Sequence, residues 1–295
     1  MYMKRVSRGD RIINIAFYLI LGVLSLICVY PLWYAAVASI SGSTYVNSGA
    51  FILLPRGMHF DAYQYAFGQK QLWIGYRNTI FYTVGGTLFG LAVCLPAGYA
   101  LSRRDLPYRG VLMGFLVFTM YFSGGLIPTY IVCHTLKLTN TPWILMILGS
   151  VSVYNMILIR TFFSSSIPDE LREAAFIDGC SNTRFFFQFA LPLSKAIIAV
   201  IALYIAVAHW NSYYNALVYT TDRNLQPLQM YLRQILLISI DNDYTADPET
   251  LAHIRQLVTV VRYAVIVLSS LPIMCLYPFL QKYFVQGVMI GSLKG

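Results

Sequence analysis

The segment from Pro168 to Pro192 reads PDELREAAFIDGCSNTRFFFQFALP, and its place in the chain decides how the rest is interpreted. It is polar, carries charge of both signs, and lies between long hydrophobic runs. Pro168 suits the first turn of a helix, where its missing N–H would be unpaired anyway. Gly179 suits the left-handed residue that ends a helix. The sequence therefore predicts a short helix, a turn at Gly179, and a second short helix capped by Ser181 or Thr183 and stopped by Pro192.

The first predicted helix has two distinguishable faces. Residues at positions i, i+3, i+4 and i+7 of a helix lie on one side. In this helix they are Leu171, Ala174, Ala175 and Asp178. Glu173 points roughly the other way, and the second helix contains Phe185–Phe187. We therefore expect a helix–turn–helix at a membrane surface, with its aromatic side chains toward the lipid or the helix bundle and a small-residue surface outward.

The overall composition is that of a membrane protein. Of the 295 residues, 58% are hydrophobic and only 11% are charged, with a mean hydropathy of +0.61. Soluble domains carry about a quarter charged residues. The net charge is +9, but the basic residues form no stripe with interleaved aromatics, which argues against nucleic acid as a partner. The five cysteines form no CxxC pair and are interpreted as small apolar residues.

Six runs are long and apolar enough to cross a membrane, because a spanning helix needs about 20 apolar residues. They lie near Ile12–Ile40, Asn78–Leu101, Val111–Cys133, Trp143–Phe163, Ser194–Tyr219 and Leu257–Leu280. The predicted fold is an all-α polytopic membrane protein whose transmembrane domain covers residues 12–283. Short interfacial helices are expected near Phe60–Phe67 and Leu225–Ile240.

The distribution of Lys and Arg predicts the orientation. These residues gather at the N-terminus, between the second and third spans, between the fourth and fifth spans, and in the tail. Residues 1–11 and 284–295 are therefore predicted to be cytoplasmic, giving six spans with both ends inside. Residues 168–192 then lie in the cytoplasm, between the fourth and fifth spans.

The chain contains no recognisable catalytic motif. The four histidines show no HExxH spacing, and there is no GxSxG sequence. There is also no GxxxxGK[ST] phosphate loop. We therefore expect no enzyme activity, metal or cofactor in this chain, and any ATP that drives it must be bound by another subunit.

The polar segment resembles the EAA loop of ABC importer permeases, in residue type and in spacing. Glu173-Ala174-Ala175 is followed by Asp178-Gly179, and nine residues separate Gly179 from Phe189, where the family usually has isoleucine. In that family the loop is the coupling helix, which sits in a cleft of the ATP-hydrolysing subunit. The residues that the resemblance assigns to this contact are Glu173, Ala174, Ala175, Asp178, Gly179, Leu191 and Pro192.

The C-terminal tail resembles that of the smaller permease subunit of maltose-type importers, in which it reaches between the ATPase subunits. The resemblance implies contacts from Gln286, Gly287 and Lys294. A frayed terminus is the simpler alternative.

A polar aromatic cluster supplies a possible substrate path. Trp210-Asn211 and Asn215 resemble a WN-x-aromatic-x-NA pattern of oligosaccharide permeases. Aromatic faces stack on sugar rings, and amides bind hydroxyl groups. Hydrogen bonding between helices, together with an interfacial aromatic belt, explains the same residues equally well. The candidate path residues are Tyr121, Asn155, His209, Trp210, Asn211, Tyr214 and Asn215.

Together, these resemblances imply the permease subunit of an ATP-driven carbohydrate importer, with an oligosaccharide as cargo, in the bacterial inner (cytoplasmic) membrane. The implied partners are a second homologous permease subunit or a second copy, two ATPase subunits that bind ATP and Mg, an extracytoplasmic sugar-binding protein, and the lipid bilayer. An ATP-independent secondary transporter or a membrane scaffold subunit is the alternative. No Asp or Glu lies within a predicted span, which counts against ion coupling.

Overall fold

The computed structural model describes residues 8–48, 53–237 and 258–275, and every regular element in these ranges is a helix. By their internal contacts, the described residues divide into two bodies. The first contains the residues up to Gln69 and those from Gln234 to Leu271, and the second contains Lys70–Arg233 and the residues from Pro272.

The first body contains α1 (Arg8–Ser39), α2 (Ser43–Asn47), α3 (Asp61–Gly68) and, up to Leu271, a helix over Val258–Cys275. With 32 residues, α1 extends about 48 Å, more than the ~30 Å of bilayer hydrocarbon. None of its most apolar stretch is buried inside the chain. Tyr34 of α1 meets Tyr263 edge to face, with ring centroids 5.6 Å apart. Most of the apolar surface of α1 is thus left for lipid or another chain.

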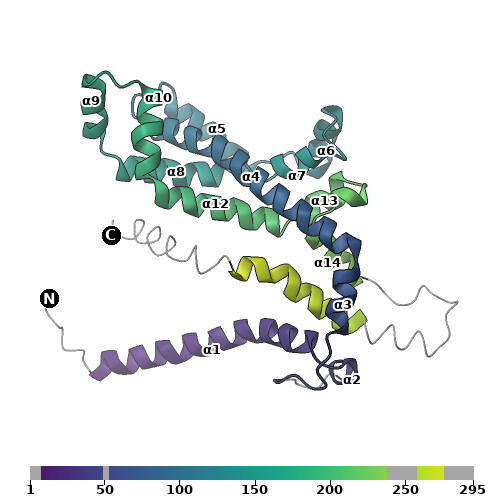
Figure 1. The fold of residues 1–295 in the computed structure, drawn as a ribbon. Coiled ribbons are helices and arrows are strands. Elements are labelled where there is room, and N and C mark those ends of the chain that lie inside the picture. Colours follow the sequence, from purple (N-terminus) through teal and green to yellow (C-terminus); the bar gives the residue numbers. More distant parts are fainter. Residues whose placement is uncertain (1–7, 49–52, 238–257, 276–295) are drawn as a thin grey trace. The chain divides into compact units, whose positions relative to one another are not determined.

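The second body is built along α4 (Lys70–Ser102), with α8 (Val153–Ser166) and α12 (Lys195–Trp210) packed against it (Figure 1). Small residues allow this close approach. A Cβ atom added at Gly86 would collide with the His209 ring, and one at Gly90 would collide with the Ser150 carbonyl. Glycine at helix contacts is typical of membrane bundles, where packing drives association.

The predicted third span, Val111–Cys133, is divided into α5 (Arg109–Tyr121) and α6 (Leu126–Thr135). The two helices are bent by 110°, and Gly125 between them has φ +83°. A run of apolar residues indicates burial in lipid or protein, but it does not reveal such a bend.

The predicted fourth span, Trp143–Phe163, is divided in the same way into α7 (Pro142–Ile147) and α8. The residues between them are not helical, and Gly149 there has φ +88°. Such a backbone conformation ends a helix and is readily adopted only by glycine.

The segment before α12 is also bent. Here α9 (Asp169–Ile177), α10 (Asn182–Phe185), a π-helical turn η1 (Phe186–Ala190) and α11 (Leu191–Leu193) precede it. The axis of Asn182–Leu193 makes an angle of 82° with that of α12. Beyond α12, a separate helix α13 (Tyr214–Tyr219) occupies the end of the predicted fifth span.

The remaining elements lie at the other end of the second body. They are η2 (Arg223–Leu225) and, up to Arg233, α14 (Leu228–Leu237). Like α3, α14 occupies a segment predicted to form a short helix. The Asn78 side chain donates to the Asn224 and Gln226 carbonyls, at 2.6 and 3.1 Å. These bonds join the η2 segment to α4.

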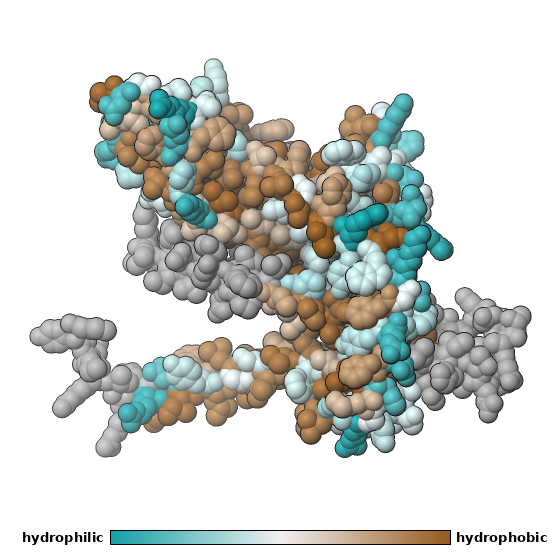
Figure 2. Space-filling model, in the orientation of Figure 1, coloured by the Kyte–Doolittle hydropathy of each residue, from teal (hydrophilic) through white to brown (hydrophobic). Residues whose placement is uncertain are grey.

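The hydrophobic surface supports a multi-pass membrane protein. In the described ranges, α1, α4 and the helix over Val258–Cys275 are long and apolar enough to cross a bilayer. The number rises to five if each of two bent pairs, α5 with α6 and Asn182–Leu193 with α12, forms one span. Figure 2 shows hydrophobic side chains along α1 and across the middle of the second body, with hydrophilic ones toward its α9 end. The count of six and the sidedness stay predictions.

Candidate functional site

The helix α9 begins and ends with local signals that the sequence contains. Pro168 is the N-cap, one residue before the helix, and Asp169 and Glu170 follow in the first turn, where they complement the helix dipole. At the other end Gly179 has φ +79°, and its N–H donates to the Phe176 carbonyl at 3.0 Å. The N–H of the next residue, Cys180, donates to the Ala175 carbonyl at 2.9 Å, which completes a Schellman motif. The prediction of a left-handed glycine at this position is confirmed.

The second short helix is capped by Ser181, one of the two predicted candidates. Its hydroxyl accepts a hydrogen bond from the Arg184 N–H at 3.3 Å. Pro192 does not stop this helix as predicted, because it lies in the first turn of α11, where proline is tolerated. The chain turns instead at Ser194, directly before α12.

The side chains of α9 separate into an outer and an inner face. The outer face is exposed and consists of Glu170, Glu173, Ala174 and Ile177. Ile177 is 87% exposed, an unusual position for a large aliphatic side chain. Asp178 and Gly179 continue this exposed surface at the end of the helix. We call these six residues the outer face of α9.

The inner face of α9 packs against the rest of the second body. Ala175 is 8% exposed and belongs to a core cluster that includes Phe185. The Phe176 ring meets the Phe185 ring edge to face at 6.5 Å, and the Arg172 guanidinium lies 5.2 Å from the Phe176 ring centre. The predicted common face of Ala174 and Ala175 is therefore divided, because Arg172, Ala175 and Phe176 at i, i+3 and i+4 form the buried stripe.

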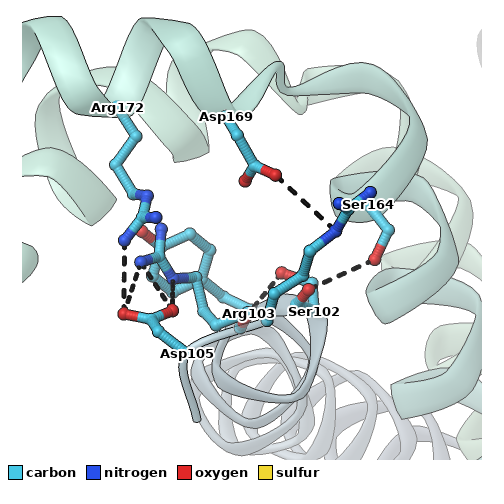
Figure 3. Close-up of polar contacts among 8 residues, drawn as sticks. Ser102, Arg103, Asp105, Ser164, Asp169 and Arg172 are labelled. Carbon is cyan, nitrogen blue, oxygen red and sulfur yellow. Dashed lines mark hydrogen bonds and ion pairs between the residues drawn. The ribbon is translucent and has the colours of Figure 1, made fainter.

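An ionic cluster joins α9 to the connection between α4 and α5. Asp105 accepts two hydrogen bonds from one Arg103 nitrogen at 2.8 and 2.9 Å, and one from Arg172 at 3.3 Å (Figure 3). The two arginine side chains are only 13% and 16% exposed, whereas Asp105 is 58% exposed. The longer contact between Arg104 and Asp169, at 3.7 Å, is exposed on both sides. Asp105 therefore contributes most of the ionic attachment of α9, reduced by its contact with solvent.

A cavity of about 170 Å³ lies beside this cluster. Its lining includes the ends of α4 and α8, the beginnings of α5 and α9, and the arginines Arg103, Arg104, Arg109 and Arg172. All four arginines belong to the Lys and Arg distribution that predicted the orientation, and no binding site was predicted from them. The density of arginine in the short connection after α4 is the sequence signal that could have indicated a site there.

Three of the proposed path residues are buried inside the chain. Asn155, His209 and Trp210 are each 5–6% exposed. His209 Nε2 lies 2.8 Å from the Ser150 hydroxyl, in the region where α4, α7, α8 and α12 meet. Ser150, which the sequence analysis missed, thus pairs with His209 within the protein.

The other four path residues are accessible. Tyr121 is 75% exposed and Tyr214 is 51% exposed. Asn211 is exposed, although its side chain donates to the Val207 carbonyl at 3.0 Å, and Asn215 is half-buried. The structure therefore divides the candidate path residues into a packed group and an accessible group.

Two further predictions have different outcomes. The tail residues Gln286, Gly287 and Lys294 lie outside the described residues. Within the described part of the chain, no group of three or more His, Cys, Asp or Glu side chains is arranged to hold a metal ion.

Comparison with known proteins gives consistent matches over nearly the whole chain. Residues 1–290 match the family described as binding-protein-dependent transport system inner membrane component. Protein LplC of Bacillus subtilis is 38% identical over 290 residues, covering 98% of this chain and 97% of the relative. The polygalacturonan/rhamnogalacturonan transport system permease protein YtcP of the same organism is 38% identical over 288 residues, covering 97% and 99%.

A solved structure is similar as well. It belongs to a bacterial ABC transporter involved in the import of the acidic polysaccharide alginate. The TM-score is 0.84 at 34% identity, covering 96% of this chain and 100% of that one.

Proposed function

Because the chain belongs to the family of binding-protein-dependent transport system inner membrane components, we propose that it is the permease subunit of an ATP-driven oligosaccharide importer. In this proposal α9 is the coupling helix, and its outer face binds an ATPase subunit. The single observation that carries the assignment is the two-sided construction of α9. Its EAA residues Glu173 and Ala174 are exposed, while Arg172, Ala175 and Phe176 fasten it to the bundle.

This construction suits the transmission of movement. A coupling helix must expose a surface to its partner and still be attached firmly enough to move the spans. Asp105 links α9 to the end of α4, and α10, η1 and α11 link it to α12. ATP and a loaded binding protein shift the permease between inward-facing and outward-facing forms only by binding one form more tightly than the other.

The proposed assembly follows from the family. It contains a second permease subunit or a second copy, two ATPase subunits that hold ATP and Mg, and an extracytoplasmic sugar-binding protein. This chain supplies six spans over residues 12–283 and no catalytic group, and residues 1–11 and 284–295 lie in the cytoplasm. The tail from residue 284 contacts the ATPase pair in this proposal.

An oligosaccharide is the proposed cargo because the name of one similar permease and the description of the similar solved transporter refer to polymeric carbohydrates. Among the candidate path residues, Tyr121, Asn211, Tyr214 and Asn215 are accessible to a sugar in the described structure. His209 and Trp210 act in this proposal through packing, because both are buried.

The test measures two quantities: how much ATPase stays bound to the purified transporter, and ATP-dependent sugar uptake. The complete transporter is purified through a tag on this chain, and the ATPase that remains bound is quantified for Glu173→Lys and Gly179→Pro. Asp61→Lys is the matched control, because Asp61, like Glu173, is an exposed helical carboxylate, but it lies on α3. We expect both α9 variants to lose most of the bound ATPase and of ATP-dependent sugar uptake in proteoliposomes, while the control retains both.

Two results would contradict the proposal. One is a Glu173→Lys transporter that keeps its ATPase and its full ATP-dependent uptake. The other is wild-type uptake that continues after ATP depletion and follows an ion gradient, as a secondary transporter would.

A further inference from the structure

The cavity beside α9 is strongly basic. Four arginines line it, against one lining aspartate, Asp169. Asp105 lies next to these arginines and compensates one more positive charge through its ion pairs with Arg103 and Arg172. Two positive charges at the cavity are therefore left without a counter-charge among the described residues.

Two of the arginines have unused hydrogen-bond donors. The side chain of Arg109 makes no ion pair or hydrogen bond with any described residue, although Arg109 is half-buried. The Nε atom of Arg172 is buried and has no hydrogen-bond partner in the described chain. Buried donors are rarely left unpaired, because desolvation without a partner is costly.

Contacts within the chain hold part of this lining in position. Arg103 is fixed by its bonds to Asp105, and its guanidinium lies 6.0 Å from the Tyr99 ring centre. Arg109 is the first residue of α5 and follows Tyr108, which has φ +55°. The first turn of α5 contains no acidic residue, so the helix dipole adds to the positive potential.

We propose that this cavity, which we call the arginine pocket, binds a phosphate group. Planar guanidinium groups bind phosphate oxygens with paired hydrogen bonds. A phosphate carries one charge as a diester and up to two as a monoester or free ion, which matches the two uncompensated positive charges. The group is supplied either by the headgroup of an anionic phospholipid or by a small soluble phosphate.

The pocket has a structural consequence for α9. Arg172 belongs to α9 and Arg109 begins α5, so a phosphate that contacts both joins the two helices. This adds to the link that Asp105 already makes. The position of the pocket at the cytoplasmic face rests on the proposed function, whereas its binding chemistry does not.

The test uses the purified complete transporter and variants with single substitutions. Arg109→Gln removes an unpaired lining charge, and Arg104→Gln removes a charge whose side chain is 86% exposed, so this variant is expected to fold normally. Arg184→Gln is the matched control, since Arg184 lies on α10 outside the pocket and forms a hydrogen bond with Gln188.

Two measurements distinguish the two sources of phosphate. In the lipid arm, native mass spectrometry measures phosphatidylglycerol retained from nanodiscs, with phosphatidylcholine as the neutral comparison. In the soluble arm, phosphorus NMR measures binding of inorganic phosphate to the transporter in phosphatidylcholine nanodiscs.

We expect Arg109→Gln to weaken binding about tenfold, Arg104→Gln to weaken it less, and Arg184→Gln to leave it unchanged. Specific retention of phosphatidylglycerol identifies the lipid source, and binding of inorganic phosphate without lipid preference identifies the soluble source. Asp169→Asn, which removes a negative charge from the lining, should tighten binding. Phosphate that binds to the ATPase subunits is common to all variants and cancels in the comparison.

The proposal is overturned if wild-type and Arg109→Gln transporters bind both probes equally, or if Arg184→Gln loses as much as Arg109→Gln. The first result is also the one expected if a carboxylate of a partner protein fills the pocket. A negative result in this phosphate-binding test would not contradict the proposed binding of an ATPase subunit to the outer face of α9. Conversely, a Glu173→Lys transporter that keeps its ATPase would not alter the Arg109 comparison.

Discussion

The polar residues of α9 and those of α12 differ in where their side chains lie. On α9, Glu173 and Asp178 face outward, and the helix is held by the opposite side. On α12, His209 is directed into the protein, where it meets Ser150 and the backbone at Gly86. Polar residues next to apolar runs therefore have two different roles in this chain. On α9 they are exposed and available to a partner protein, whereas on α12 His209 is buried and hydrogen-bonded within the protein.

Because of this difference, substitutions on the two helices should affect different properties of the protein. Changes on the outer face of α9 should affect transport while leaving the fold intact. Changes around His209 should affect the fold first and transport only as a consequence. Measuring stability and uptake on the same variants distinguishes these two behaviours.

The largest expected loss of stability is at the contact between α4 and α12. Gly86→Leu should destabilise the protein by about 3 kcal/mol, because even a Cβ at this position collides with the His209 ring. The measurement is thermal unfolding of the detergent-solubilised chain. Gly114→Leu on α5 is the control, because nothing lies within 4 Å of a Cβ there. Equal stability of the two variants would contradict the tight α4–α12 contact.

His209→Ala should cost about 2 kcal/mol, because it leaves the Ser150 hydroxyl without its 2.8 Å partner and opens space against α4. His209→Gln should restore part of this loss, since an amide can bond to the hydroxyl. Unfolding and sugar uptake are compared for the three proteins. If His209→Ala loses uptake at unchanged stability, then His209 contacts the substrate and the contrast with α9 fails.

Asp105→Asn should lower stability by about 1–2 kcal/mol, because Arg103 and Arg172 lose their shared counter-charge while remaining largely buried. The exposure of Asp105 keeps the effect below that of a fully buried pair. Hydrogen exchange of the α9 amides is the measurement, and faster exchange is expected there. Asp61→Asn is the control, and unchanged α9 exchange in Asp105→Asn would show that the ionic cluster does not hold α9.

Gly179→Ala should loosen the end of α9 by about 1 kcal/mol, because its φ of +79° is unfavourable for a residue with a Cβ. Gly179→Asn should be tolerated better, since asparagine adopts left-handed conformations more readily. No atom lies within 4 Å of the added Cβ, so the cost is conformational and not steric. Exchange of the Cys180 amide reports the effect, and equal values for alanine and asparagine would contradict it.

The smallest change in stability is expected for Ile177→Ser. The side chain is 87% exposed in the isolated chain, so unfolding should shift by less than about 0.5 kcal/mol. ATPase retention should nevertheless fall, because an exposed isoleucine on the outer face offers apolar area to a partner. A loss of stability without a loss of ATPase would place Ile177 in the fold instead of the interface.

Local sequence signals determined where α9 begins and ends and where α10 begins. The left-handed Gly179, the Ser181 cap and the acidic first turn of α9 depend on residues within a few positions of one another, which a sequence displays directly. The multi-pass, all-helical architecture follows from hydropathy, which is likewise a property of continuous runs.

Contacts between distant residues were decided only by the tertiary structure. His209 and Ser150 are 59 positions apart, and Arg172 and Asp105 are 67 positions apart. The helix breaks at Gly125 and Gly149 were also decided by the tertiary structure, because an apolar run is compatible with one continuous span or with two separate helices. Composition and periodicity show which residues avoid water, but burial of Ala175 and His209, exposure of Ile177, and the convergence of four arginines depend on which helices pack together.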